Sequence, residues 1–248
     1  MLKILLLGSS LFLLFNCATT NKKNVEEAKT FYEAGTTALV QGDYTDALER
    51  LLKAVELDPN NPFYHNNLAY SYQKKKIYEK AKFHFEKALE LKKDFPDAQN
   101  NLGVLYLEMN KPKEALKYCE QAVKDPLYKT PQKAYLNIGR AHYKLQNFKK
   151  ALEYQRKAVA IDKNFCYAYN SLGMTEMKVK EFNSAATSFK KAINICKTYE
   201  APYYVLGLNY IKAKQKNLAL KQFNVLLRRF PEGKYSAKAE KIIKVLRK

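Results

Sequence analysis

Residues that make tight turns are scarce in this sequence. It has 8 glycines and 8 prolines among 248 residues, too few for the many tight turns of an all-β fold. It also lacks tryptophan, so its bulky apolar positions are filled by 19 tyrosines and 13 phenylalanines. Because 47% of its residues are apolar, the composition is typical of a folded protein and argues against disorder.

Residues that carry catalysis or bind metals are also scarce. The three histidines are His65, His84 and His142, and no His-Glu-x-x-His, Cys-x-x-Cys or glycine-rich phosphate loop occurs. His65 and His142 fall at positions of the helical pattern that usually pack, and His84 precedes the bulky Phe85. We interpret all three as buried or half-buried structural histidines, and the sequence predicts no enzymatic activity, no cofactor and no metal site.

Acidic residues are outnumbered by basic ones. Lys and Arg total 44 against 24 for Asp and Glu, which gives a net charge of +20. In a cytosolic protein this excess would suggest nucleic acid as a partner, but the N-terminus indicates export, and exported proteins meet little nucleic acid. The basic residues cluster at 74–76 and in the last predicted helix. They form either a solvated surface or one that attracts anionic partners such as phospholipid headgroups, cell-wall polymers or acidic proteins.

No apolar run in the sequence is long enough to span a bilayer. The longest, residues 4–15, follows a basic start and has the length of a signal-peptide core. It ends in residues 14–17 (LFNC), which resemble a bacterial lipobox, although Asn16 stands where Gly, Ala or Ser is usual.

The lipobox resemblance implies a lipoprotein. Residues 1–16 would be the signal peptide, Cys17 would carry a diacylglyceryl group, and residues 17–27 would form a flexible tether. The alternatives are a plain secretory leader with a chance cysteine and an uncleaved anchor. Ala18 follows the cysteine in place of Asp, which implies delivery to the outer membrane. We expect the chain to face the periplasm, with the cell surface as the alternative.

The strongest signal in the sequence is an internal repeat. Residues 100–122 contain Gly103, Ala115 and Ala122, and small residues recur at matching places along the chain. Those matching Gly103 are Gly35, Ala69, Gly139, Gly173 and Gly207, and those matching Ala115 are Ala47, Ala81, Ala151, Ala185 and Ala219. The steps between these alanines are 34, 34, 36, 34 and 34 residues. A period this regular indicates stacked copies of one supersecondary unit.

Each repeat is predicted to contain two amphipathic helices. In the third repeat, Leu102, Leu105 and Tyr106 have helical spacing. A second stripe begins at Ala115, shortly after Pro112, a residue that suits the first turn of a helix. Because neither helix can bury its stripe alone, each pair must stack on its neighbours.

This pattern resembles the tetratricopeptide repeat. The resemblance implies an all-α fold, a right-handed α-solenoid of six helix pairs closed by a capping helix at residues 234–248. The six repeats are residues 28–61, 62–95, 96–129, 132–165, 166–199 and 200–233. The phase shifts by two at residues 125–131, where Pro126 and Pro131 stiffen the chain. This segment is either a harmless loop insertion or a change of superhelix angle between two three-repeat halves.

The three cysteines beyond the N-terminus have different expected roles. Cys119 lies in the packing stripe and is predicted to be a core residue. Cys166 begins the fifth repeat and Cys196 lies near its end, so antiparallel helices could bring them together in an oxidising periplasm. The odd number of cysteines and their unknown facing leave that pairing open.

The tetratricopeptide resemblance also implies a binding surface. In this family the first helix of each repeat lines a concave face, where asparagine amides suit a peptide backbone, tyrosines add contact area and lysines attract acidic residues. The residues predicted to bind there are Asn66, Asn67, Tyr70, Asn100, Asn101, Asn137, Arg140, Tyr143, Lys144, Tyr167, Asn170, Lys178, Tyr204 and Lys212, with Gln73, Val104, Met174 and Leu208 at neighbouring positions. Asn67, Asn101 and Asn137 also follow the repeat consensus, which explains them without a binding role. The set lacks the complete carboxylate clamp that holds chaperone tails.

The layout of a lipobox, six repeats and 248 residues resembles the pilotin lipoproteins of type IV pili. It also resembles lipoproteins that present cell-wall hydrolases to a periplasmic protease. Both resemblances imply a membrane-anchored, non-catalytic scaffold that binds a protein or an extended peptide segment and supports assembly of an envelope complex. The alternative is a surface-exposed adhesin or ligand-binding lipoprotein that uses its basic exterior.

Overall fold

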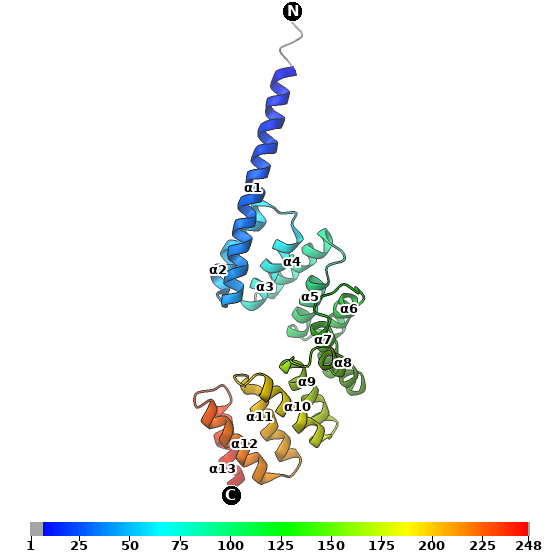
Figure 1. Ribbon diagram of the computed structural model, residues 1–248, viewed down its shortest axis with the longest axis vertical. Helices are drawn as coiled ribbons and strands as arrows, with labels where there is room; N and C mark the ends of the chain where they lie inside the picture. Colours follow the sequence, from blue (N-terminus) through cyan, green and yellow to red (C-terminus); the bar gives the residue numbers. More distant parts are fainter. Residues whose placement is uncertain (1–6, 248) are drawn as a thin grey trace, which may run out of the picture. The chain divides into compact units, whose positions relative to one another are not determined.

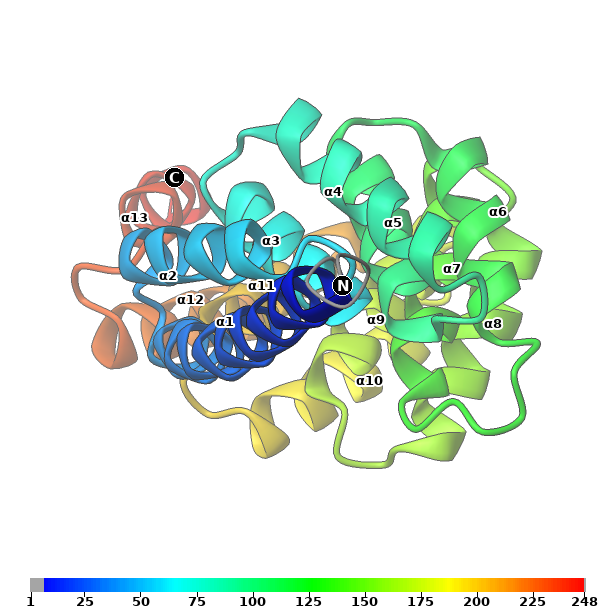
Figure 2. The ribbon, with the colours of Figure 1, turned by 90° about the horizontal axis from the view of Figure 1, so that it is seen from above.

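The computed structural model describes residues 7–247, with side chains from Lys23 onward. This part of the chain forms thirteen helices and no strand (Figures 1 and 2). The helices are α1 (Leu7–Gln41), α2 (Tyr44–Leu57), α3 (Pro62–Lys74), α4 (Tyr78–Leu91), α5 (Pro96–Glu108), α6 (Pro112–Ala122), α7 (Pro131–Lys144), α8 (Phe148–Ile161), α9 (Cys166–Lys178), α10 (Phe182–Ile195), α11 (Glu200–Lys212), α12 (Lys216–Arg229) and α13 (Ser236–Arg247). The predicted all-α solenoid of tandem helix pairs is confirmed.

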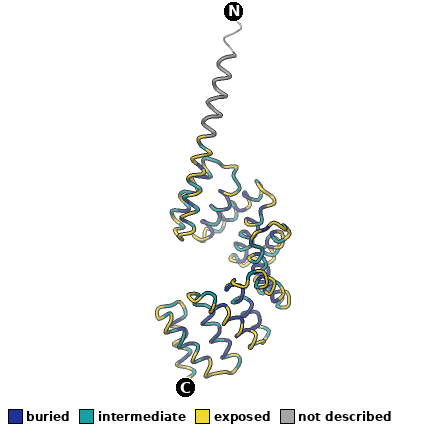
Figure 3. The backbone as a smooth tube through the Cα atoms, viewed as in Figure 1, coloured by how far each residue is buried: buried dark blue, intermediate teal, exposed yellow. Residues whose placement is uncertain are grey.

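The chain divides into two compact units, one up to Leu105 and one from Tyr106 onward. The N-terminal unit contains α1 to α4 and most of α5, and the C-terminal unit contains the end of α5 and α6 to α13. The division therefore falls within α5 and not at residues 125–131, where one interpretation of the sequence placed the junction of two halves. In each unit, buried residues run along the helices and exposed residues gather at the turns (Figure 3).

Residues 125–131 form a turn whose tyrosine joins the core. Tyr128 packs with Ala122 of α6 and Ala134 of α7, whereas Leu127 is exposed. The backbone N–H of Leu127 donates to Asp125 Oδ1 at 2.8 Å and tightens the turn. The additional residues thus place one aromatic ring between successive repeats.

Small residues in the first helix of a pair let the second helix approach closely. A Cβ added at Gly207 would lie 2.5 Å from Cε1 of Phe223, which is fully buried. In the α7–α8 pair, Gln155 occupies the position that Phe223 has in the α11–α12 pair. Its Cγ would lie 2.6 Å from a Cβ added at Gly139. Gln155 is fully buried, and its Nε2 donates to Ser171 Oγ of the next repeat at 2.9 Å. In these two pairs the packing therefore depends on a missing Cβ on the first helix.

Each helix pair turns through a residue with positive φ. These residues are Gly42 (82°), Lys76 (61°), Asn110 (58°), Gln146 (61°), Lys180 (66°) and Lys214 (58°). In the second repeat, Lys76 N–H donates to the Gln73 carbonyl and Ile77 N–H to the Tyr72 carbonyl, both at 2.9 Å. This bonding satisfies the last carbonyl groups of α3 and is the Schellman way of ending a helix.

Helix α1 corrects one expectation. It extends from Leu7 to Gln41 and so includes residues 17–27, where the sequence predicted a flexible tether. No glycine or proline occurs between Gly8 and Gly35, so nothing in the sequence ends a helix there. The side chain of Cys17 lies outside the described part. No helix among the described residues combines the length and the apolar character that crossing a membrane would require.

The predicted capping helix is confirmed as α13. Its Ala239 and Ile243 are buried in the last core cluster, while its lysines are exposed. The Glu200 carboxylate at the start of α11 accepts hydrogen bonds from the backbone N–H groups of Lys234, at 3.0 Å, and Tyr235, at 2.8 Å. Gly233 makes room for this carboxylate, which a Cβ would overlap. One acidic side chain therefore holds the turn that precedes the cap.

Candidate partner-binding surface

The residues predicted to bind a partner differ widely in exposure. They lie on α3, α5, α7, α9 and α11, the first helices of their pairs. Asn66, Asn100 and Asn137 are buried; Asn67, Tyr70, Asn101, Tyr143, Asn170 and Tyr204 are half-buried; and Arg140, Lys144, Tyr167, Lys178 and Lys212 are exposed. The exposed members are mostly cationic, and the asparagines lie deeper.

Asparagines of the N-terminal unit bind one another across repeats. Asn101 Nδ2 donates to Asn66 Oδ1, Asn66 Nδ2 donates to Asn67 Oδ1, and Asn67 Nδ2 donates to Thr36 Oγ1, each at 3.1 Å. The chain of bonds connects α5, α3 and α1. Each asparagine amide can donate and accept at once, so it continues such a chain. These amides therefore hold successive first helices together. A bound peptide would have to hydrogen-bond to amides that already make these contacts between repeats.

One acceptor beside this asparagine row has no hydrogen bond. Gln73 is buried near the end of α3, and its Oε1 has no hydrogen-bond partner among the described residues. An unsatisfied buried acceptor costs about 1–3 kcal/mol. Because this oxygen is closed off from solvent, a partner could donate to it only if the Gln73 side chain turned outward.

In the C-terminal unit, an asparagine and a tyrosine from opposite ends of the fifth repeat meet. Asn170 Nδ2 of α9 donates to the Tyr199 hydroxyl at 3.2 Å, and the buried Asn170 Oδ1 has no hydrogen-bond partner in the described chain. The Tyr199 ring lies 4.8 Å from that of Tyr167, which is 55% exposed. Burial, and then the neighbouring Tyr167 and Tyr235, raises the pKa of Tyr199.

Two further tyrosines extend this group. The rings of Tyr204 and Tyr235 stack with centroids 4.7 Å apart and planes at 17°. We call Tyr167, Tyr199, Tyr204 and Tyr235 the tyrosine cluster. Sequence reasoning found Tyr167 and Tyr204 but missed Tyr199 and Tyr235, because the latter two lie in connections between helix pairs, outside the family's binding positions. Their only signal in the sequence is an aromatic residue next to the start of a helix.

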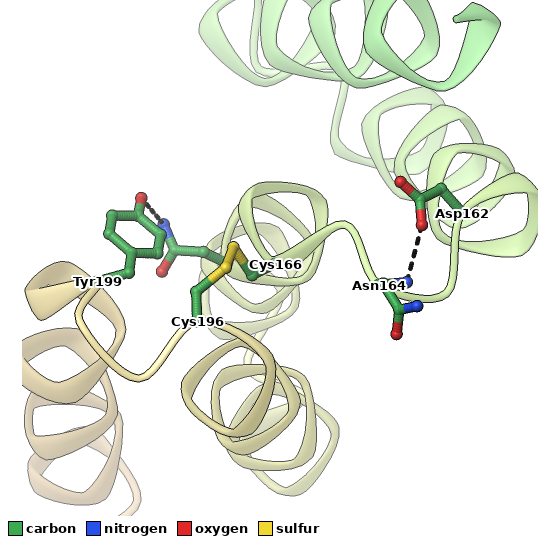
Figure 4. The surroundings of a disulfide bond; sticks show 6 residues. Asp162, Asn164, Cys166, Cys196 and Tyr199 are labelled. Atoms are coloured by element: carbon green, nitrogen blue, oxygen red, sulfur yellow. Dashed lines mark hydrogen bonds between the residues drawn. A yellow bond between two sulfur atoms is a disulfide. The ribbon is translucent and has the colours of Figure 1, made fainter. Parts of the chain in front are cut away.

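A disulfide between Cys166 and Cys196 closes the fifth repeat, which carries Tyr167 and Tyr199 (Figure 4). It joins the first residue of α9 to the end of α10, with the two Cα atoms 6.0 Å apart. The sequence had left this pairing open. Because Tyr199 follows Cys196 by three residues, the bond fixes the start of the connection on which Tyr199 lies.

Cys119 does not take part in a disulfide. It is fully buried in α6, as the sequence predicted, and burial raises the pKa of its thiol to about 12. A thiol that stays protonated is a poor nucleophile, so Cys119 acts as a small core residue.

Cationic residues at the ends of the first helices bind neutral partners. Arg140 Nη1 donates to Asn137 Oδ1 at 3.1 Å, and Lys144 Nζ donates to Asn110 Oδ1 at 3.0 Å. These bonds leave the positive charges uncompensated. The arrangement can therefore still attract acidic groups of a partner.

The histidines have structural partners. His65 Nδ1 lies 2.9 Å from His84 Nδ1, and His65 Nε2 lies 2.9 Å from the Pro59 carbonyl oxygen. His142 is buried and stacks on Tyr154. Among the residues with described side chains, no three His, Cys, Asp or Glu residues are grouped as a metal site would require.

Family models match most of the chain. Those described as "Tetratricopeptide repeat" match residues 62–95, 96–124, 132–165, 167–199 and 203–233, and one described as "TPR repeat" matches residues 39–76.

Two curated relatives are similar over part of their length. The chain is 26% identical over 149 residues to the type IV pilus assembly protein PilF of Pseudomonas aeruginosa, which covers 60% of this chain and 59% of PilF. It is 33% identical over 97 residues to the photosystem I assembly protein Ycf3 of Synechococcus elongatus, which covers 38% of this chain and 56% of Ycf3. The chain thus spans less than two thirds of the length of both relatives.

Solved structures are similar over more of the chain. PilW, described as a widely conserved type IV pilus biogenesis factor, is 25% identical with a TM-score of 0.78, covering 85% of this chain and 97% of PilW. Pseudomonas aeruginosa PilF, at 20% identity and a TM-score of 0.73 over 88% of this chain and 98% of PilF, shows the same fold. Repeated helix pairs, small residues at their contacts and family-model matches agree: the chain belongs to the tetratricopeptide-repeat family.

Proposed function

We propose that this chain is a non-catalytic scaffold for type IV pilus biogenesis in the bacterial envelope, of the pilotin kind. The observation that carries the proposal is the agreement of two comparisons on one process. The curated relative PilF is a type IV pilus assembly protein, and the structurally similar PilW is a type IV pilus biogenesis factor. The likeness to PilW covers 85% of this chain, so it includes the repeats of both units.

The proposed scaffold is a lipoprotein anchored through Cys17 in the outer membrane and facing the periplasm. Its lipobox supports the anchor, although Asn16 departs from the usual pattern. The Cys166–Cys196 disulfide supports an oxidising compartment, because disulfides persist in the periplasm and are rare in the cytosol. Its excess of basic residues would attract anionic polymers of the envelope.

The proposed partner is a protein segment that binds in an extended form along the first helices within a single unit. Two buried acceptors at these helices, Gln73 Oε1 and Asn170 Oδ1, have no hydrogen-bond partner among the described residues. Both oxygens are closed off from solvent, so the backbone N–H groups of an extended segment would satisfy them only after the two amides turned outward. The tyrosine cluster offers rings with large contact area and little conformational freedom to lose, beside hydroxyl groups that can bond to the segment.

A crosslinking pull-down from isolated envelopes tests this function. The tagged chain is expected to capture a component of the pilus machinery, and deletion of its gene is expected to abolish surface pili and reduce assembly of the secretin. Capture of a cell-wall hydrolase with normal piliation would contradict the pilus role and favour the hydrolase-adaptor alternative.

Protease added to intact cells tests the orientation. A periplasmic scaffold is protected until the outer membrane is opened. Removal of the chain from intact cells would overturn the periplasmic location and favour a surface adhesin.

A further inference from the structure

Three turns of the C-terminal unit are rich in lysine. They join α7 to α8, α9 to α10 and α11 to α12 and can be followed in Figure 1. Their charged residues are Lys144, Lys149, Lys150, Lys178, Lys180, Glu181, Lys212, Lys214 and Lys216, all of them exposed. We call this set the lysine edge.

The turns at the other ends of these helices have a different charge. Counted from the last residue of one helix to the third residue of the next, these turns (122–133, 161–168, 195–202 and 229–238) contain seven lysines and one arginine against two aspartates and two glutamates. Counted in the same way, the three turns of the lysine edge (144–150, 178–184 and 212–218) contain eight lysines and one glutamate. The net positive charge of the turns in this unit is therefore larger on one side of the helix layer.

The three turns lie next to one another. Glu181, at the start of α10, lies 4.0 Å from Arg156 of α8. Asn209, in the last part of α11, donates through Nδ2 to the Phe182 carbonyl at 2.9 Å. The first contact joins the α9–α10 turn to α8 of the preceding repeat, and the second joins the start of α10 to α11 of the following repeat, so the three turns follow one another along one side of the unit.

The lysines of this edge have no anionic partner within the protein. Among the residues whose side chains are described, none of the eight makes an ion pair, and the edge's one carboxylate faces Arg156. Lys180 and Lys214 also occupy positive-φ positions, where glycine would be least strained, as at Gly42. A lysine at each of these two turns therefore carries a cost in backbone strain that a glycine would not.

We propose that the lysine edge docks the C-terminal unit onto an anionic phospholipid surface. Its lysines stand on projecting turns, which suit a flat layer of phosphate groups, whereas a peptide is usually held in a groove. Lysine is a compact charge on a flexible stem, so several can adjust to separate headgroups at once. Leu218, in the first turn of α12 and 45% exposed, adds an apolar side chain beside Lys216 that can enter the interface. The proposal rests on the envelope location given above, but not on a role in pilus assembly.

Vesicle co-sedimentation tests the proposal without the lipid anchor. The protein is residues 18–248, which keep every buried residue of the described chain, beginning with Ala28. The vesicles contain two parts phosphatidylcholine to one part phosphatidylglycerol, with pure phosphatidylcholine as the reference. The edge variant carries Lys149→Gln, Lys180→Gln, Lys214→Gln and Lys216→Gln. At positions 180 and 214 glutamine is a matched replacement, because Gln146 already occupies the corresponding positive-φ position in the α7–α8 turn.

A control variant removes the same charge elsewhere in the unit. It carries Lys190→Gln, Lys238→Gln, Lys241→Gln and Lys244→Gln, all exposed on α10 and α13. Binding to anionic vesicles is expected to exceed binding to pure phosphatidylcholine and to weaken with salt. The edge variant is expected to bind at least about tenfold more weakly than the wild type, and the control variant much less so.

Three outcomes would overturn the proposal. They are equal binding to both vesicles, an equal loss in the edge and control variants, and binding to soluble poly-glutamate without binding to vesicles, which would indicate an acidic protein partner. Thermal unfolding of both variants checks that they fold. A pull-down of the pilus component that fails while vesicle binding persists would refute the pilus role alone.

Discussion

Asn170 and Tyr199, at opposite ends of the fifth repeat, are joined by a hydrogen bond that uses only the NH₂ group of the asparagine amide. The Nδ2 group of Asn170 donates to the Tyr199 hydroxyl at 3.2 Å, while its Oδ1 is buried without a hydrogen-bond partner in the described chain. The contact lies next to the Cys166–Cys196 disulfide, at the end of α10. Because this oxygen is closed off from solvent, a donor from a partner could reach it only if the Asn170 amide turned outward.

Replacement of Asn170 by alanine is expected to weaken partner capture more than it weakens the fold. The change removes one hydrogen bond to the partner, which should lower the affinity for the partner about two- to tenfold. The free energy of unfolding should change little, because an unsatisfied buried acceptor is removed together with one long hydrogen bond. Titration of the crosslinked partner segment and thermal unfolding measure the two effects. Asn194→Ala, at an exposed position of α10, is the matched control, and equal loss of binding in both variants would contradict a role for Asn170.

Loss of the disulfide is expected to destabilise the C-terminal unit. Cys166 and Cys196 are separated by 30 residues, so replacing both with serine should lower the free energy of unfolding by about 2–4 kcal/mol. Urea unfolding measures the change, and the reduced wild type should behave like the double variant. If reductant did not change the urea unfolding of the wild type, the disulfide would not form in solution. Partner binding should fall in parallel, because the connection carrying Tyr199 loosens.

Acid is expected to destabilise the N-terminal unit through His65 and His84. Since the Pro59 carbonyl only accepts, His65 carries its proton on Nε2 and accepts at Nδ1 from His84. Burial lowers the pKa of both histidines, that of His84 to about 4, where the neighbouring His65 adds to the effect. In the unfolded chain both pKa values return to about 6.5. The contribution of the neutral His65–His84 pair to the free energy of unfolding is therefore complete above about pH 6.5 and is lost as the pH falls toward about 4.

Urea unfolding at a series of pH values checks this dependence. The wild type should lose stability through that window, and His84→Phe should lose less, because the ring can still stack on Tyr72 and no longer titrates. Lys80 and Lys87, which also lower the pKa values of this pair, are left unchanged in the variant. Identical pH profiles for wild type and variant would refute the assignment.

Gly207→Ala is expected to lower stability by about 1–3 kcal/mol, since its new Cβ would meet the Phe223 ring. Phe223→Leu alone should also lower the free energy of unfolding. Adding Gly207→Ala should lower it by less in the Phe223→Leu variant than in the wild type. A double-mutant cycle by chemical denaturation measures this coupling. Additive effects would mean that the α11–α12 pair adjusts without contact between the two residues.

The helix pairs were predictable because their determinants repeat along the chain. A missing Cβ at Gly207 and an alanine at Ala219 report a close helix–helix contact that recurs every 34 residues in most of the chain. The same pattern placed Cys119 in the core and α13 at the end of the solenoid. It did not identify the partners of Asn66 and Asn101, because a recurring asparagine is compatible with both a peptide and a neighbouring repeat.

The sequence by itself determined the family, the helix pairs and the packed small residues, since these depend on spacing within one repeat. Only the tertiary structure decided which residues of different segments meet. It paired Cys166 with Cys196, brought Tyr199 and Tyr235 to Tyr167 and Tyr204, and aligned the lysine-bearing turns. The reason is physical: the stacking of helix pairs sets the distances between connections, and no local sequence pattern relates one connection to another.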